Sequence, residues 1–345
     1  MVHDFASLGD SISACLRGAD RWPELSDAVQ KSIAVNPWFT ETNIHRMLTA
    51  IAEDWLDVSN LIPWLRAYAV TDTPAPVGVV MAGNIPLVGF HDFLCVLASG
   101  NSFIGKPSHN DRFLLPALAA RLIDSNPRWQ RRITFVDALP FDRLGAFIAT
   151  GSDTTARHFA AIADAGAIPA LIRHNRRSAA LLTGRETTAE LHALADDILA
   201  YFGLGCRNVS LLYIPEGYDF SPLAAVLAAR AGIRRYAAYD HNYRYRKAIL
   251  TIEGKPLIDA SAVLLCNEST LHAPPAVVHF DFYKHLSDAL ETIDRHSELL
   301  QCVVGDTRIC DKFCTFGAAQ RPALHHYADG IDTMRLLNTV NRPID

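Results

Sequence analysis

The stretch VGVVMAGNIPL, residues 77–87, decides the fold. Residues 77–81 are apolar without interruption, which is the pattern of a strand buried on both faces of a parallel sheet. Gly83, Asn84 and Pro86 then predict a turn, and residues 87–99 have a helical pattern. A buried strand that ends in a turn and leads into a helix is the first unit of an alternating α/β fold.

The same alternation continues after this stretch. Further strands are predicted at 102–105, 133–136, 146–149, 168–172 and 179–182, with helices at 111–124 and 187–200. In a doubly wound parallel sheet, ligands bind beyond the carboxyl ends of the strands. Asn84, Lys106 and Gly151-Ser152 all follow predicted strands and are therefore candidate binding residues. Neither G-x-G-x-x-G nor G-x-x-x-x-G-K-[ST] occurs, so a dinucleotide would be held in another way.

A second informative stretch is YFGLGCRNVS, residues 201–210, which joins a predicted helix to a predicted strand. Gly203 and Gly205 allow a tight turn and close approach of a substrate to the backbone. Arg207 would favour the thiolate of Cys206, which is the reactive form of cysteine. The alternative for Cys206 is a small buried hydrophobic residue, because free cysteine is commonly buried.

The secondary structure of the remaining segments is predicted from their hydrophobic patterns. Residues 1–68 are amphipathic helices that we expect to pack into a core. A second α/β unit is expected from 209 to 316, with strands at 211–214, 248–252, 262–265 and 276–280 and helices at 221–231 and 283–298. Basic and tyrosine residues over 239–247 are interpreted as a solvated face, with a phosphate-binding patch as the alternative.

Composition and charge argue against several classes of protein. The net charge is −5, which argues against a nucleic-acid-binding surface over the whole protein. No apolar run reaches the roughly 18–20 residues of a membrane span, and the start, Met1 to Asp4, shows no secretory pattern, so we expect a cytoplasmic protein. The seven scattered cysteines include no C-x-x-C pair, which favours reduced thiols and predicts no metal site.

Four segments resemble the aldehyde dehydrogenase superfamily in both order and spacing. They are 76–86, Lys106-Pro107-Ser108, Thr150-Gly151-Ser152 and the Cys206 loop. Residues 82–88, 203–208 and 327–333 are more specifically similar to its acyl-CoA reductase branch, which is related to the fatty-acid reductases of bacterial luminescence. The resemblance covers roughly residues 75–335.

The resemblance implies an α/β, aldehyde-dehydrogenase-like fold, with a doubly wound parallel-sheet cofactor domain and a second α/β catalytic domain. The expected parts are a helical segment (1–70) packed on the cofactor domain, a dinucleotide-binding domain (71–200), a catalytic domain with the nucleophilic cysteine (201–318), and a C-terminal segment (319–345) that returns toward the cofactor domain.

The resemblance also implies roles for single residues. Cys206 would be the nucleophile, and Asn84 with the Cys206 backbone N–H would bind the developing oxyanion. The expected cofactor-binding residues are Lys106, Pro107 and Ser108 at the adenosine ribose, Gly151 and Ser152 near the pyrophosphate, and Phe316 and Gly317 near the nicotinamide ribose.

Two departures from the superfamily pattern shape the expected reaction. Dehydrogenases that release acids carry a glutamate where this chain has residues 172–178, which contain no carboxylate. A second glutamate, ahead of Phe316-Gly317, is replaced by Cys314. The lack of a base for a deacylating water favours a thioester pathway.

We therefore expect NAD(P)H-dependent reduction of an acyl thioester, fatty acyl-CoA or acyl-carrier-protein, to the aldehyde. His109 follows Ser108 and would tolerate a 2′-phosphate, which favours NADPH over NADH. The alternatives are acyl-phosphate reduction, CoA-acylating aldehyde oxidation and a non-catalytic scaffold of the same fold. A homodimer or a biosynthetic complex is a further expectation.

Overall fold

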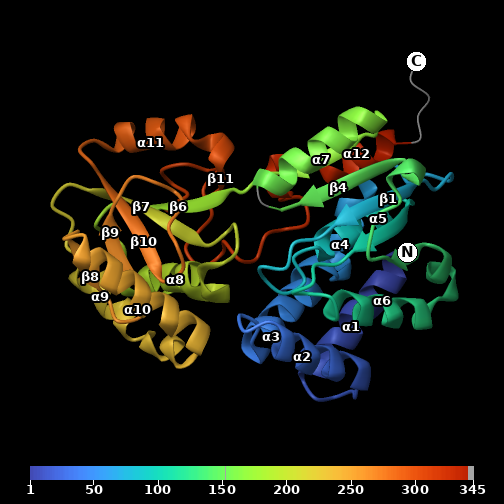
Figure 1. Cartoon of the computed structure of the whole chain (residues 1–345), viewed down its shortest axis with the longest axis horizontal. Coiled ribbons are helices and arrows are strands. Elements are labelled where there is room, and N and C mark those ends of the chain that lie inside the picture. The colour runs from blue at the N-terminus through green and yellow to red at the C-terminus, as the bar shows by residue number, and fades with distance from the viewer. Residues whose placement is uncertain (152, 341–345) are drawn as a thin grey trace. The chain divides into compact units, whose positions relative to one another are not determined.

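The computed structural model describes residues 1–151 and 153–340. The chain forms two compact units, each with its own parallel sheet (Figure 1). The first unit contains Met1–Asn175 and the segment that starts at Pro322, and the second contains Arg176–Arg321. No described helix is long and apolar enough to cross a membrane.

The first unit is built on a five-stranded sheet in the order β3-β2-β1-β4-β5, with all neighbouring pairs parallel. Its strands are β1 (Pro76–Val80), β2 (Ser102–Lys106), β3 (Ile133–Phe135), β4 (Ala146–Thr150) and β5 (Ala170–Arg173). The chain moves outward from β1 to β3 and then returns to place β4 on the other side of β1. The switch in strand order therefore lies between β1 and β4, where ligands of such sheets bind.

Helices surround this sheet because its strands are buried on both faces. In β1, Val77 and Val79 are fully buried, and a Cβ at Gly78 would lie 2.6 Å from a methyl carbon of Leu144. The helices of the unit are α1 (Val2–Leu16), α2 (Pro23–Val35), α3 (Glu41–Ala50), α4 (Val58–Arg66), α5 (Phe90–Ala98), α6 (Leu114–Ser125), α7 (Asp153–Gly166) and α12 (Thr333–Thr339). A π-helical turn, Ile51–Trp55, follows α3. Helix α5 packs on β1 and β2, and α7 packs on β4 and β5.

Aromatic side chains join the N-terminal helices to the C-terminal segment within the first unit. The Trp64 indole N–H donates to the Tyr327 hydroxyl at 2.8 Å, and Tyr327 donates to Tyr68 at 2.9 Å. Tyr68 then donates to the Asp332 carboxylate at 2.9 Å. Trp64 is buried together with Trp22 and Trp55, and the segment that starts at Pro322 belongs to the unit that carries β1.

The second unit is built on a six-stranded sheet in the order β11-β6-β7-β10-β9-β8, in which only the β8–β9 pair is antiparallel. Its strands are β6 (Arg177–Leu181), β7 (Val209–Pro215), β8 (Leu257–Asp259), β9 (Leu264–Asn267), β10 (Val277–Tyr283) and β11 (Leu300–Val304), and its helices are α8 (Thr188–Leu199), α9 (Ser221–Ala228), α10 (Ala237–Ile252) and α11 (Leu286–Arg295). Helices cover both faces of this sheet, α8 and α9 on one face and α11 on the other (Figure 1). Successive residues of β6 point to opposite faces, so Ala180 packs with residues of α8 and α9, whereas Ala179 packs with residues of α11.

Two sequence predictions are wrong in this unit. The expected strand at 248–252 is the end of α10, a 16-residue helix, because a short apolar run does not by itself distinguish strand from helix. Tyr239 and Tyr243 of the expected solvated face are buried, with the Tyr239 hydroxyl 2.9 Å from the Ala262 carbonyl oxygen and the Tyr243 hydroxyl bonded to Asp259. Tyr245 of the same helix is exposed.

The division between the units differs from the range 71–200 expected for the cofactor domain. Strand β6 and helix α8 fall within that range but belong to the second unit. The reason is strand pairing, since β6 lies between β7 and β11. The strands predicted at 77–81, 102–105, 133–136, 146–149, 168–172 and 179–182 correspond to β1–β6, and the predicted α/β fold class is confirmed.

A buried ion pair stabilises the first unit. Arg173, at the end of β5, contacts the Asp92 carboxylate of α5 at 2.5 Å and 2.6 Å through its two terminal nitrogens. A third bond joins Arg173 to the Thr333 hydroxyl oxygen at 3.1 Å. Both charged side chains are buried, so removal of one partner leaves an uncompensated charge in the core.

We predict that Arg173→Met lowers the free energy of unfolding by about 3–5 kcal/mol, measured by urea unfolding. The double variant Arg173→Met/Asp92→Leu removes both charges and should recover much of that loss. A single variant within roughly 0.5 kcal/mol of the wild type would contradict a stabilising role for this pair.

Candidate active site

The first group of candidate residues lies at the carboxyl edge of the first sheet. Asn84 is in the turn after β1, and the Ser108 turn follows β2. The two turns touch, because a Cβ at Gly83 would lie 2.5 Å from the Ser108 hydroxyl oxygen. The Asn36 side-chain amide, at the end of α2, reaches the carbonyl oxygens of Gly83 at 3.5 Å and Asn110 at 3.3 Å. Glycine at 83 is therefore required by close packing between the loops that carry Asn84 and Ser108.

Asp111 anchors the turn that carries Asn84. Its carboxylate accepts the Leu87 backbone N–H at 2.7 Å, and Leu87 has a left-handed φ of 55°. Residues Ser108 and Asp111 also form an antiparallel backbone bridge. The second carboxylate oxygen of Asp111 is buried and has no hydrogen-bond partner among the described residues. Burial raises the pKa of Asp111 to about 7, against the lowering effect of the Leu87 N–H.

The other expected cofactor residues occupy neighbouring strand ends. Lys106 is the last residue of β2, and its carbonyl oxygen accepts the Met81 N–H at 3.1 Å. Gly151 follows β4, and a Cβ there would lie 2.7 Å from a Thr155 methyl carbon, so glycine lets α7 start directly after the strand. Ser152 lies outside the described residues. Because β1 pairs with both β2 and β4, the structure brings the loops of Asn84, Lys106 and Gly151 to one edge of one sheet.

The motif at 327–333 closes around the end of β5. Asp329 has a φ of 59°, and its carboxylate accepts the His174 backbone N–H at 3.3 Å. Thr333 bonds to Arg173, as described above. The segment 172–178 contains no carboxylate of its own, yet the fold brings Asp329 to it from the C-terminal segment. Sequence reasoning missed this contact because it spans more than 150 residues of chain.

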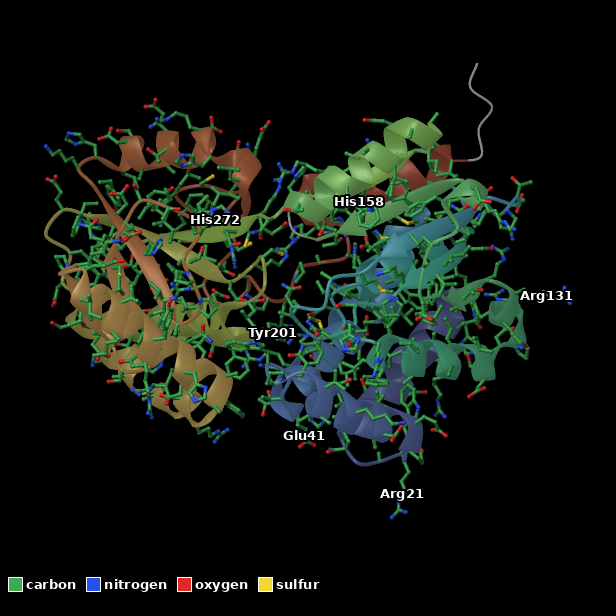
Figure 2. The ribbon with its side chains drawn as sticks, in the orientation of Figure 1. Arg21, Glu41, Arg131, His158, Tyr201 and His272 are labelled. Atoms are coloured by element: carbon green, nitrogen blue, oxygen red, sulfur yellow. The ribbon has the colours of Figure 1, made fainter. Side chains whose placement is uncertain are left out.

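The Cys206 loop in the second unit is preceded by unusual backbone. Tyr201, Phe202 and Gly203 have successive positive φ values of 50°, 61° and 74°. Such conformations cost free energy for residues other than glycine and persist only where the surroundings enforce them. Tyr201, labelled in Figure 2, and Phe202 are both buried, and the Phe202 ring packs against those of Tyr236 and Tyr239. Side-chain burial therefore holds the chain in the turn that leads to Cys206.

Asn208 ties this loop to the end of α8. Its side-chain oxygen accepts the Gly205 N–H at 2.8 Å, while its amide donates to the carbonyl oxygens of Asp197 at 2.9 Å and Ala200 at 2.8 Å. These carbonyl groups belong to the last turn of the helix, where backbone acceptors lack helical partners. A single buried side chain thus fixes the backbone on both sides of Cys206. Cys206 itself is a partly exposed residue.

Ser178 supports Cys206 from the neighbouring strand. Its hydroxyl donates to the Cys206 carbonyl oxygen at 2.9 Å and lies 3.2 Å from the Cys302 sulfur. Ser178 is fully buried in β6, which pairs with β7 directly after the loop. The Cys206 backbone is therefore held from α8 and from β6.

A second pair of thiols lies in the same unit. Cys314 bridges to β11, with its N–H 2.8 Å from the Val303 carbonyl oxygen, and its side chain bonds to that of Cys302. The Cys302 hydrogen bond lowers the pKa of Cys314, burial opposes this, and the Arg207 guanidinium lowers it further. Arg207, expected to act on Cys206, therefore also favours a thiolate at Cys314. Cys314 stands two residues before Phe316, where the superfamily resemblance led us to expect glutamate.

Asp197 positions the Phe316-Gly317 segment. Its carboxylate accepts the backbone N–H groups of Gly317 at 2.6 Å and Ala319 at 3.1 Å. Burial raises the pKa of Asp197 to about 7, and these two hydrogen bonds oppose the shift. Gly317 has a φ of 86° and packs against Ala193 of α8. The end of α8 therefore organises both the Cys206 loop, through Asn208, and the Phe316-Gly317 segment, through Asp197.

The structure thus places the predicted residues in two groups. Asn84, Lys106, Pro107, Ser108 and Gly151 share the edge of the first sheet, and Cys206, Phe316 and Gly317 share the end of α8. The expected approach of Asn84 to Cys206 joins residues of different units and stays a prediction. Sequence reasoning missed Asp111, Asp197 and Ser178 as supporting groups, because their roles come from contacts between separate elements. Among residues 1–151 and 153–340, no cluster of three His, Cys, Asp or Glu side chains is placed to hold a metal ion.

The buried Asp111 carboxyl gives a pH-dependent prediction. Its pKa is higher in the folded chain than the usual 3.8, so its contribution to stability is largest below 3.8 and declines as the pH rises through about 7. Asp111→Asn keeps an acceptor for the Leu87 N–H but cannot ionise. We predict that the stability of this variant relative to the wild type increases by roughly 1–3 kcal/mol between pH 5 and pH 8.5, measured by urea unfolding. The same difference at both pH values would contradict burial of an ionising carboxyl.

Comparison with solved structures identifies the fold. The chain is similar to an NAD+ complex of aldehyde dehydrogenase from Bacillus cereus, with a TM-score of 0.63 and 12% identity over 91% of this chain and 74% of that chain. Lactaldehyde dehydrogenase from Escherichia coli matches with a TM-score of 0.61 and 13% identity over 90% and 77%. Aldehyde dehydrogenase 21 from Physcomitrella patens, in complex with succinate, matches with a TM-score of 0.61 and 13% identity over 90% and 74%.

Comparison with protein families identifies the branch. The family model described as Acyl-CoA reductase (LuxC) matches residues 24–237, which is more than half of the chain. No curated protein sequence matches this chain. Family and fold together make the protein an oxidoreductase that acts on aldehyde or acyl groups. The chain belongs to the acyl-CoA reductase (LuxC) family and has the aldehyde dehydrogenase fold.

Proposed function

We propose that this protein reduces an acyl thioester, fatty acyl-CoA or the corresponding acyl-carrier-protein, to the aldehyde through a thioacyl intermediate on Cys206. The observation that carries the proposal is the Cys206 loop. Cys206 is a partly exposed residue, and its backbone is fixed by Asn208 from α8 and by Ser178 from β6. A nucleophile held in this way needs little reorganisation to attack a carbonyl group.

The first half-reaction forms the thioacyl-enzyme. The Cys206 thiolate attacks the thioester carbonyl carbon, the bond to the coenzyme A sulfur breaks, and that sulfur leaves with the electron pair as a thiolate. The developing oxyanion accepts hydrogen bonds from the Cys206 backbone N–H and the Asn84 side chain. Donors fixed in advance at such a position commonly contribute roughly 10²–10³ in rate.

A nicotinamide dinucleotide would supply the hydride for the second half-reaction. The first sheet suits it, because the loops of Lys106, Ser108 and Gly151 lie next to the change in strand order between β1 and β4. The Bacillus cereus enzyme of the same fold is described as an NAD+ complex. NADPH is favoured over NADH, since His109 follows Ser108 and the nearest following carboxylate, Asp111, is buried and bonded to Leu87. Phe316 and Gly317 would contact the nicotinamide side.

Hydrolysis of the thioacyl group would waste the substrate. The strongest argument against it is Arg173, which stands in the segment where acid-forming relatives carry their glutamate and is bound to Asp92. Asp329 is the carboxylate that the fold brings to this segment, and it accepts the His174 N–H. The proposal therefore expects aldehyde as the product and little free acid.

We predict that intact-mass spectrometry after incubation with a panel of acyl-CoA compounds and no cofactor shows one acyl adduct. Peptide mapping should place it on Cys206, and Cys206→Ala should abolish both the adduct and the reductase activity. Cys314→Ser is the matched control, because the pKa of the Cys314 thiol is lowered, and this variant should keep the adduct.

Several outcomes of this experiment would overturn the proposal. Retained activity in Cys206→Ala would remove Cys206 as nucleophile. An adduct formed only with acyl phosphates would indicate acyl-phosphate reduction. Rapid release of free acid would indicate hydrolysis, with Asp329→Asn as the variant to test for the base. The absence of any adduct, with all seven cysteines alkylated at equal rates, would indicate a non-catalytic scaffold.

A separate prediction concerns Asn84. Asn84→Ala should lower kcat roughly 10²–10³-fold with little change in acyl-CoA binding, because the lost donor acts on charge that develops in the transition state. The control is Asn36→Ala, which alters support of the same loop from α2 and should have a smaller effect. An unchanged kcat in Asn84→Ala would leave Asn84 as a turn residue.

A further inference from the structure

Arg177 is a cation without an acidic partner among the described residues. It is the first residue of β6 and is partly buried. Its Nε atom is buried and has no hydrogen-bond partner within residues 1–151 and 153–340. The Nε atoms of Arg173 and Arg176 share this property, but the terminal nitrogens of Arg173 pair with Asp92 and one of Arg176 donates to the Leu300 carbonyl oxygen at 3.2 Å. A partly buried guanidinium without a counter-charge is costly, so its retention calls for an anion nearby.

The anion next to Arg177 is the ionised form of Cys206. Ser178, the next residue of β6, holds the Cys206 carbonyl group at 2.9 Å, so the start of β6 and the Cys206 loop are in direct contact. The pairing of Ser178 with Val209 in the β6–β7 ladder fixes this contact, because Val209 starts β7 directly after the Cys206 loop. Burial lowers the pKa of Arg177, and the charge of the Cys206 thiolate raises it, in agreement with this contact.

We propose that Arg177, together with Arg207 of the Cys206 loop, favours the thiolate of Cys206 and is therefore a positioning residue for the nucleophile. This inference rests on the proposed role of Cys206 and identifies the source of its reactivity. An opposite charge close to a cysteine favours the thiolate, which is the nucleophilic form. When the thiolate attacks the thioester, its charge moves to the oxyanion and then leaves with the coenzyme A thiolate, so no proton has to be removed from Cys206 in the acylation step.

The test is the pH–rate profile of iodoacetamide alkylation at Cys206, followed by peptide mass mapping on the full-length chain. Cys314→Ser serves as the background, so that the second thiolate does not consume reagent. Arg177→Met should slow alkylation roughly tenfold near pH 7 and move the profile to higher pH. Arg177→Lys restores the charge and should recover most of the rate.

Arg176→Met is the matched control, since it removes the same charge one residue away, from a side chain that bonds to the Leu300 carbonyl oxygen. It should leave the Cys206 profile unchanged. An unchanged profile in Arg177→Met, or equal slowing in Arg176→Met and Arg177→Met, would overturn the proposal. A folding defect is distinguished near pH 10, where Cys206 ionises in every variant and Arg177→Met should react as fast as the background protein.

The outcomes separate this inference from the proposed function. If acyl-CoA compounds do not acylate Cys206, the proposed reaction fails, yet the alkylation profile still reports whether Arg177 controls the thiol. If acylation occurs and Arg177→Met leaves the alkylation profile unchanged, the reaction stands and the role of Arg177 is wrong.

Discussion

The Asn208 side chain is the interaction on which the second unit's site depends. Four hydrogen bonds join it to Gly205 on one side and to the carbonyl groups of Asp197, Ile198 and Ala200 on the other. It therefore ends α8 and shapes the Cys206 loop at the same time. The left-handed residues between the helix and the loop are tolerated because their aromatic side chains are buried. Burial of these aromatic side chains in the core therefore also holds the turn before Cys206 in place.

Both units use a buried aspartate to hold a loop at the site. Asp111 bonds to the backbone of the Asn84 turn, and Asp197 bonds to the backbone of the Phe316-Gly317 segment. Burial raises the pKa of each carboxyl to about 7. These hydrogen bonds fix the conformation of loops that lie outside helices and strands. Ionisation of each buried carboxyl costs free energy, because the carboxylate is poorly solvated.

Three arginines close together in sequence have different physical roles. Arg173 neutralises Asp92 inside the first unit, Arg176 bonds to a backbone carbonyl, and Arg177 starts the strand that contacts the Cys206 loop, with no carboxylate partner among the described residues. The sequence of residues 172–178 was informative because it lacks a glutamate. Its positive charges became interpretable only when their partners were known, because a guanidinium acts through whatever anion lies within a few ångströms.

The sequence by itself determined the α/β class and most strands of both sheets, and it identified Cys206 as the candidate nucleophile. These features are local, since they follow from runs of buried apolar residues, from glycines and from ordered motifs along the chain. The tertiary structure alone decided that β6 belongs to the second sheet, that residues 248–252 are helical, and that Asp111, Asp197 and Ser178 hold the loops of the candidate residues. Strand pairing and buried hydrogen bonds join residues far apart in sequence, and no local pattern specifies which distant partner satisfies a buried polar group.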